Sequence, residues 1–127
     1  MYLLDSSAVI EILHNTESGK EIVSMIEKNA VCITSINVYE ILRGENEKDG
    51  GKISQFFSSV EILNFDENAA RFSVDLEKKL ILSGKTINKI DILIAGICKS
   101  RNKILVSLDK DFKKIEGLKV AMFKGKQ

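Results

Sequence analysis

The chain has 127 residues with 19 Lys+Arg and 18 Asp+Glu, a formal net charge of +1, and a length that suits one domain spanning residues 1–127. Its 44% hydrophobic and 29% charged residues exclude an intrinsically disordered chain. No apolar run approaches the roughly 20 residues that cross a bilayer, and the start has no basic leader before Asp5, so we expect a cytoplasmic protein without a membrane partner.

The spacing of apolar residues predicts short strands that alternate with longer amphipathic helices. In chain order we expect a strand at 2–4, helices at 6–13 and 21–28, a strand at 31–33, a helix at 36–43, a loop at 47–52 with a flexible turn at Gly50-Gly51, a helix around 53–57, a strand at 60–63, helices at 66–82 and 88–100, and strands at 104–106 and 119–122. This alternation indicates an α/β protein with a mostly parallel, buried sheet.

Acidic residues occur where open parallel sheets place their sites, outside the carboxyl ends of the strands. Asp5 follows the first strand, Glu40 lies on the helix after the second, and Asp109 follows the strand at 104–106. Asp91 lies near the start of a later helix. Clustered carboxylates repel one another unless a cation joins them, and oxygen ligands of this kind bind Mg²⁺ or Mn²⁺. The pattern therefore predicts a divalent metal site.

Each of these acids also has a purely structural interpretation. Asp5 suits a helix N-cap, and Asp109 suits a turn. Glu40 and Asp91 each follow an asparagine by three residues, the spacing of a capping box. However, Asp91 interrupts the apolar run at 90–95 and borders the apolar face of its helix, where a charge is costly without a partner. The coincidence of all four at one sheet edge favours a functional site.

Four motifs follow one another in the order Leu4-Asp5-Ser6-Ser7, Thr34-Ser35 with Glu40, Asp91-Ile92-Leu93-Ile94-Ala95 and Val106-Ser107-Leu108-Asp109-Lys110-Asp111-Phe112. In this order and spacing the chain resembles the PIN-domain ribonucleases over essentially its whole length. Within them it is similar to the VapC toxins of VapBC toxin–antitoxin pairs. The resemblance implies a three-layer α/β/α sandwich, an endoribonuclease that requires Mg²⁺ or Mn²⁺, a homodimer, and a VapB-like antitoxin as partner.

The same resemblance implies roles for individual residues. The catalytic and metal-ligating positions are Asp5, Glu40, Asp91 and Asp109. Ser7 and Ser107 match the small hydroxyl residues that hold the acids in place, although threonine is commoner at the position of Ser107. Asp111 is a supporting candidate, and Arg43 is expected to make a local ion pair or backbone contact.

Water activated by the metal is the expected nucleophile, because the sequence offers no Cys–His pair. The single histidine, His14, is expected at the surface, and Cys32 and Cys98 are expected to be buried reduced thiols. In-line attack on an RNA phosphodiester would leave 5′-phosphate and 3′-hydroxyl ends. Residues 99–127 hold nine basic and three acidic residues, which suits either phosphate binding or a solvated surface. The expected contacts to the RNA backbone are Lys85, Lys89, Lys99, Arg101, Lys110 and Lys113.

Two other functions stay open on the sequence. A phosphohydrolase of the haloacid-dehalogenase type also starts with a strand that ends in aspartate, but usually has a second acid where this chain has Ser7. A PIN-like binding module with intact acids would act by titrating a partner. The apolar helices near 21–28 and 53–57 would then supply dimer or antitoxin surfaces, although packing in the core explains them more simply.

Overall fold

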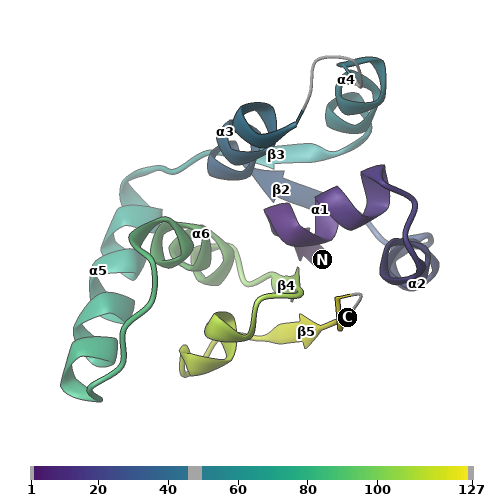
Figure 1. Ribbon diagram of the computed structural model, residues 1–127. Helices are drawn as coiled ribbons and strands as arrows, with labels where there is room; N and C mark the ends of the chain where they lie inside the picture. The colour runs from purple at the N-terminus through teal and green to yellow at the C-terminus, as the bar shows by residue number, and fades with distance from the viewer. Residues whose placement is uncertain (1, 46–49, 126–127) are drawn as a thin grey trace.

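Strands and helices alternate along the chain in the computed structural model, which describes residues 2–45 and 50–125 (Figure 1). The elements are β1 (Tyr2–Leu4), α1 (Ser6–Leu13), α2 (Glu17–Ile26), β2 (Val31–Thr34), α3 (Ser35–Gly44), α4 (Gly50–Ser59), β3 (Glu61–Leu63), α5 (Glu67–Leu82), α6 (Lys89–Ser100), β4 (Ile104–Ser107), the 3₁₀ helix η2 (Lys110–Lys114) and β5 (Val120–Met122).

The five strands form one sheet in the order β3-β2-β1-β4-β5, and every neighbouring pair is parallel. The first strand of the chain is therefore central, with β4 beside it although a hundred residues separate them in sequence. Parallel strands require crossover connections, and the helices provide them. As a result the carboxyl ends of all five strands share one edge of the sheet.

Helices cover both faces of the sheet, because neighbouring strand residues point to opposite faces. Leu3 and Leu105 pack with α5 and α6 in one buried cluster. Leu4 and Val106 pack with α1, α2 and α4 in a second cluster. The apolar residues of α2 and α4 contribute to that second cluster, with Ile22 and Ile53 buried in it. Figure 1 shows the sheet between α5 and α6 on one side and α1 and α2 on the other, and the predicted three-layer α/β/α sandwich is confirmed.

Two helices begin three or four residues before the positions that the sequence predicts. Helix α2 begins at Glu17, four residues before the expected start, because the Thr16 side chain caps it by accepting the Gly19 N–H at 3.0 Å. Gly50 and Gly51 belong to the first turn of α4, so the expectation of a flexible turn there was wrong. The periodicity that buries Ile53 continues one turn toward the N-terminus. Residues 47–49 of the expected loop lie outside the described residues.

Helices α1 and α2 approach closely at Gly19. A Cβ atom at this position would overlap the backbone carbonyl of Glu11. Backbone atoms cannot rotate aside as a flexible side chain can, so the contact requires glycine. Both Ser18 and Gly19 are buried as a result.

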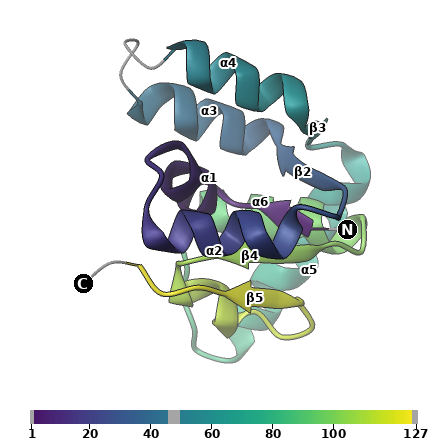
Figure 2. The same cartoon turned by 90° about the vertical axis from the view of Figure 1, so that its right-hand side faces the viewer.

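The chain that follows β5 lies against the body of the protein, beside α2 (Figure 2). The Phe123 N–H donates to the Ser107 carbonyl at 2.9 Å, and the Ser18 hydroxyl donates to the Lys124 carbonyl. These bonds fix the segment at the edge of the sheet. Within residues 2–45 and 50–125, no helix has the length and apolar character that crossing a membrane demands.

Candidate metal centre at the carboxyl edge of the sheet

Asp5 is the most buried acid at this edge, with 4% of its surface exposed. It follows β1 and caps α1, with its Oδ1 accepting the Ala8 N–H at 3.0 Å. The Ser7 hydroxyl donates to the same oxygen at 2.7 Å, and the Ser107 hydroxyl donates to Oδ2 at 2.5 Å. Burial raises the pKa of Asp5 above its ordinary value, and the hydrogen bonds from Ser107 and Ser7 oppose that rise.

Ser7 and Ser107 also connect Asp5 to the loop after β4. The Ser7 hydroxyl oxygen accepts the Leu108 N–H at 3.1 Å, and the Ser107 hydroxyl oxygen accepts the Asp109 N–H at 2.9 Å. Each hydroxyl therefore donates to the carboxylate and accepts from the loop backbone, which uses both of its functions. The position of Asp109 relative to Asp5 is fixed by these two serines.

Glu40 reaches the edge from α3 and is held by a chain of polar contacts. Its Oε1 accepts the Ser6 hydroxyl at 2.7 Å, and the Ser6 oxygen accepts an Asn37 Nδ2 proton at 3.0 Å. Asn37 Oδ1 in turn accepts the backbone N–H and the hydroxyl of Thr34, at 2.9 and 2.7 Å. Thr34 and Asn37 form the capping box of α3. Glu40 is therefore not needed as a cap and stays available at the edge.

Ser6 was not predicted to support the acids, and Asn37 was predicted only as the capping partner of Glu40. The available signal was local: Thr34 followed three residues later by Asn37 is the spacing of an N-cap and its partner. The contact from Asn37 to Ser6 joins residues 31 positions apart. Local spacing carries no information about such a contact.

Replacing Asn37 with alanine is expected to destabilise the fold by about 2 kcal/mol, because buried groups of Thr34 would lose their acceptor. The comparison is the free energy of unfolding in urea for the wild type, Asn37→Ala and Asn68→Ala. Asn68 is exposed on α5, so its replacement should change stability by no more than about 0.5 kcal/mol. Equal stability of all three proteins would show that the Thr34–Asn37–Ser6 contacts contribute little.

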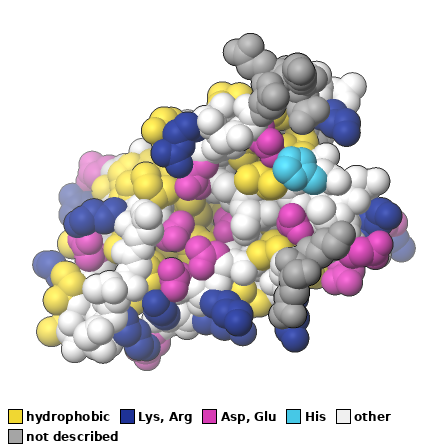
Figure 3. All heavy atoms as spheres, viewed as in Figure 1, with side chains coloured by type: hydrophobic (Ala, Val, Ile, Leu, Met, Phe, Trp, Pro, Cys, Tyr) yellow, Lys and Arg dark blue, Asp and Glu magenta, His cyan; other side chains and the backbone are white. Residues whose placement is uncertain are grey.

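Three further carboxylates lie close together beside Asp5. Asp91, Asp109 and Asp111 each have a carboxylate oxygen within 4.8 Å of one on the other two. Asp91 comes from the first turn of α6, and Asp109 caps η2 by accepting the Asp111 N–H at 2.9 Å. Figure 3 shows acidic side chains gathered near the middle of this face.

The pKa of Asp91 is strongly raised in this cluster. Burial raises its pKa to about 7, and the charges of Asp109, Glu40, Asp5 and Asp111 add to the rise. The four predicted acids and Asp111 therefore act on one another electrostatically, although they come from four separate segments. Asp111, which the sequence suggested only as a supporting residue, is one of the three whose oxygens approach most closely.

The donor set suits a hard divalent cation. The four predicted acids and Asp111 all offer carboxylate oxygens. Mg²⁺ and Mn²⁺ prefer such oxygen ligands, and softer metals do not. Among the residues that the structure describes, one ion pair involves these acids: Lys114 lies 2.9 Å from Asp111. The remaining negative charge has no fixed counter-ion, so the residues present fit a divalent cation.

Not every expected basic residue lies near this cluster. Lys99 and Arg101 lie at the C-terminal end of α6, and the ten residues from Asp91 to Arg101 span roughly 15 Å of helix. Arg101 pairs with Asp66 at 3.3 Å, and Lys89 with Glu77 at 3.1 Å. The helical rise therefore separates Lys99 and Arg101 from the acids, and their contact with the RNA backbone stays a prediction.

Arg43 makes a different contact from the expected ion pair or backbone bond: its guanidinium carbon lies 5.4 Å from the centroid of the Tyr39 ring, one helical turn away on α3. His14 is half exposed and lies 3.0 Å from Glu45, as expected for a surface residue. Cys32 and Cys98 are both buried and free, as expected. None of these residues contributes to the acidic cluster.

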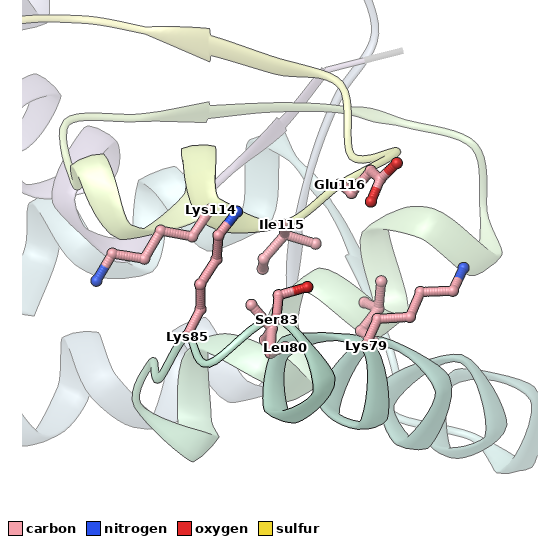
Figure 4. Close-up of a pocket in the computed structure, with 8 residues that line it drawn as sticks. Lys79, Leu80, Ser83, Lys85, Lys114, Ile115 and Glu116 are labelled. Carbon is pink, nitrogen blue, oxygen red and sulfur yellow. The ribbon is translucent and has the colours of Figure 1, made fainter.

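A cavity beside the C-terminal end of α5 is too small to be an alternative site. Figure 4 shows its lining, in which Lys79, Lys85 and Lys114 surround Ser83 and Ile115. Its volume is about 20 Å³, which is room for a single water molecule. The acidic cluster remains the better candidate for a functional centre.

Comparison with known proteins agrees with this geometry. The family described as "PIN domain" matches residues 2–118. Ribonuclease VapC2 of Haemophilus influenzae is 30% identical over 126 residues, covering 93% of this chain and 94% of the relative. The tRNA(fMet)-specific endonuclease VapC of Shigella flexneri is 24% identical over 124 residues, covering 93% and 94%.

Solved structures show the same fold. VapBC2 from Rickettsia felis, bound to a DNA fragment from its promoter, superposes with a TM-score of 0.86 at 24% identity, covering 97% of this chain and 98% of the other. DNA-bound VapBC from Salmonella typhimurium gives a TM-score of 0.83 at 24% identity, covering 95% and 96%.

Proposed function

Because the chain belongs to the PIN-domain family, among relatives named as VapC ribonucleases, we propose that it is a metal-dependent endoribonuclease and the toxin of a VapBC pair. The observation that carries this proposal is the convergence of carboxylates from four segments on one sheet edge, with the pKa of Asp91 raised to about 7. Its substrate is RNA and its partner is a VapB-like antitoxin. A cytoplasmic location, a single domain over residues 1–127 and a homodimer belong to the same proposal.

The proposed ligands are Asp5, Glu40, Asp91 and Asp109, with Mg²⁺ or Mn²⁺ as the ion and Asp111 in support. A divalent cation bound there would lower the pKa of water and neutralise charge on the phosphodiester. The Asp5 carboxylate is held in one orientation by three hydrogen bonds. The hydroxyls of Ser7 and Ser107 each donate one, and the Ala8 N–H donates the third. Ser6 orients Glu40 in the same way.

Burial and the neighbouring acids favour the protonated form of Asp91 in the metal-free protein, because they raise its pKa to about 7. Releasing that proton leaves a carboxylate that repels its four acidic neighbours. The free energy of that repulsion favours any cation that the cluster can accept. The same residues therefore bind the ion and lose a proton when they do so.

Of the two alternative functions, the family match argues against one, and an RNA cleavage assay tests the other. The match to the PIN domain over residues 2–118 argues against a phosphohydrolase of the haloacid-dehalogenase type, and Ser7, at the position of its second acid, is bonded to Asp5. A non-enzymatic binding module has the same fold and the same acids. It differs in one measurable property, the ability to cut RNA.

RNA cleavage by the metal-depleted protein is expected to be absent and to return when Mg²⁺ or Mn²⁺ is added. The assay follows a structured RNA whose products carry 5′-phosphate ends if attack is in line. Asp5→Asn should abolish cleavage, since it removes the buried ligand. Asp75→Asn is the matched control, because Asp75 is exposed on α5, outside the acidic cluster.

The outcomes separate the candidates. Equal cleavage by the wild type and Asp5→Asn would indicate a contaminating nuclease. A wild type that binds the ion but cuts no RNA would indicate the binding module.

A further inference from the structure

A pocket of about 340 Å³ lies between η2 and the segment that follows β5. Its volume falls in the range of sites that bind small organic molecules. Three lysines line it, Lys110, Lys113 and Lys124, together with the apolar side chains of Leu108, Met122 and Phe123. A cation-lined pocket with an apolar floor matches the two parts of a nucleotide, a phosphate and a base.

The pocket adjoins the acidic cluster through the backbone. Lys110 follows Asp109 in sequence, and the Phe123 N–H donates to the Ser107 carbonyl at 2.9 Å. The hydroxyl of Ser107 donates in turn to Asp5. The loop after β4 thus lines the pocket on one side and holds the acids on the other. A ligand in the pocket therefore contacts the same loop that carries Asp109.

The three lysines are available to a ligand. Among residues 2–45 and 50–125, the ion pairs engage Lys89 and Lys114 and none engages Lys110, Lys113 or Lys124. Three like charges around one pocket repel one another, and an anion removes that repulsion. The positive charge of the pocket therefore favours an anionic ligand, whereas the acidic cluster favours a cation.

The apolar floor is held in place. Leu108 and Phe123 are partly buried and pack against the cluster that includes Leu4 and Val106. The Ser18 hydroxyl bonds to the Lys124 carbonyl and fixes the far wall. Other proteins bind single-stranded nucleic acid with the same combination, in which basic side chains contact the phosphate backbone and a base stacks on an aromatic side chain.

We propose that this pocket binds the nucleotide next to the scissile phosphate of single-stranded RNA, with Lys110 and Lys113 contacting its phosphate and Phe123 contacting its base. This inference rests on the proposed ribonuclease function, because RNA is the anion that such an enzyme must hold beside its acids. An acidic peptide is the other anionic ligand that the pocket's charge would accept, and the test below separates the two.

The test measures binding of a short fluorescent single-stranded RNA as a function of salt. All proteins carry Asp91→Asn, which the proposed mechanism makes inactive. For single strands, each lost phosphate contact lowers the slope of log K against log salt by about 0.7. The double variant Lys110→Gln/Lys113→Gln loses contact with the one phosphate that both lysines are proposed to bind, so it should lower the slope by about 0.7. Lys78→Gln, an exposed lysine of α5, should leave it unchanged.

The same assay tests the base contact. RNAs that carry an abasic site at one position at a time should lose about fivefold in affinity at the position that occupies the pocket. The loss should persist in the lysine double variant, because the two contacts involve different atoms.

An unchanged salt slope in the double variant, or abasic RNAs that all bind equally well, would overturn the inference. Binding of a polyglutamate peptide that is lost in the lysine double variant, while RNA binding is unchanged, would also overturn it, since the pocket would then hold peptide. Failure of the wild type to cut RNA would instead refute the proposed function. That result comes from a different protein and a different readout, so the two failures are distinguishable.

Discussion

Asp91→Asn is expected to abolish RNA cleavage and, at the same time, to stabilise the metal-free protein at neutral pH. The loss of activity follows because the variant lacks one of the proposed ligands. Changing residues that only support a metal ligand typically costs 10- to 100-fold. Loss of a ligand should therefore lower kcat/KM by more than roughly 100-fold.

The gain in stability follows from the titration of Asp91. Its pKa is near 3.8 in the unfolded chain and about 7 in the fold, because of burial and the neighbouring acids. Below pH 4 the carboxyl of Asp91 is protonated in both the folded and the unfolded protein, so it does not lower the free energy of unfolding. As the pH rises toward 7 the unfolded chain ionises first, and the free energy of unfolding falls. The full shift corresponds to roughly 4 kcal/mol, and solvent screening of a half-exposed carboxylate reduces this to about 2 kcal/mol.

The measurement is the free energy of unfolding of metal-free protein between pH 4 and pH 8. Asp91→Asn and the wild type should coincide at pH 4 and separate above it, with the variant more stable by about 2 kcal/mol at pH 8. Asp75→Asn serves as the control on α5. Parallel pH profiles for the wild type and Asp91→Asn would show that the acids do not act on one another, and the candidate metal centre would fail with them.

Gly19→Ala is expected to destabilise the fold by about 3 kcal/mol, the upper part of the range for overpacking. The added Cβ would overlap the Glu11 carbonyl, so α1 and α2 would have to separate. Both helices pack against the central strands. Because α1 carries Ser6 and Ser7, a displaced α1 would also move the contacts to Glu40 and Asp5.

Gly51→Ala is the matched control, since Gly51 also lies in the first turn of a helix but has no atom within 4 Å of the added Cβ. It should be neutral or up to about 1 kcal/mol stabilising, because alanine favours helix more than glycine does. Urea unfolding of the three proteins gives the comparison. A Gly19→Ala protein as stable as the wild type would mean that α2 can move away at no cost.

The fold was predictable because its strands are short apolar runs and its helices carry apolar stripes. The errors occur where that pattern is absent. The first turn of α2 has no apolar stripe, and its start depends on the cap that Thr16 supplies. Gly50 and Gly51 resemble a turn by composition, yet they continue the helix that buries Ile53.

The acids were predictable for a related reason, since the carboxyl ends of parallel strands share an edge. Their supports were not, except for Ser7 and Ser107. The contacts from Asn37 through Ser6 to Glu40 join three segments and depend on the angle at which α3 meets α1. The closeness of Asp111 depends on η2, whose single turn brings it back beside Asp109. Such distances follow from tertiary packing, which local spacing does not encode.

The central position of β1 has a consequence for synthesis of the protein. Asp5 precedes its Oδ2 partner Ser107 by about a hundred residues, and its acidic neighbours include Asp109. Strand β4 must therefore emerge from the exit tunnel before the five carboxylates can meet. A nascent chain that ends before β4 holds Asp5 and Glu40 without Asp109 or Asp111. The ribosome that translates this protein is thus not exposed to the completed acidic cluster until β4 and η2 have been synthesised.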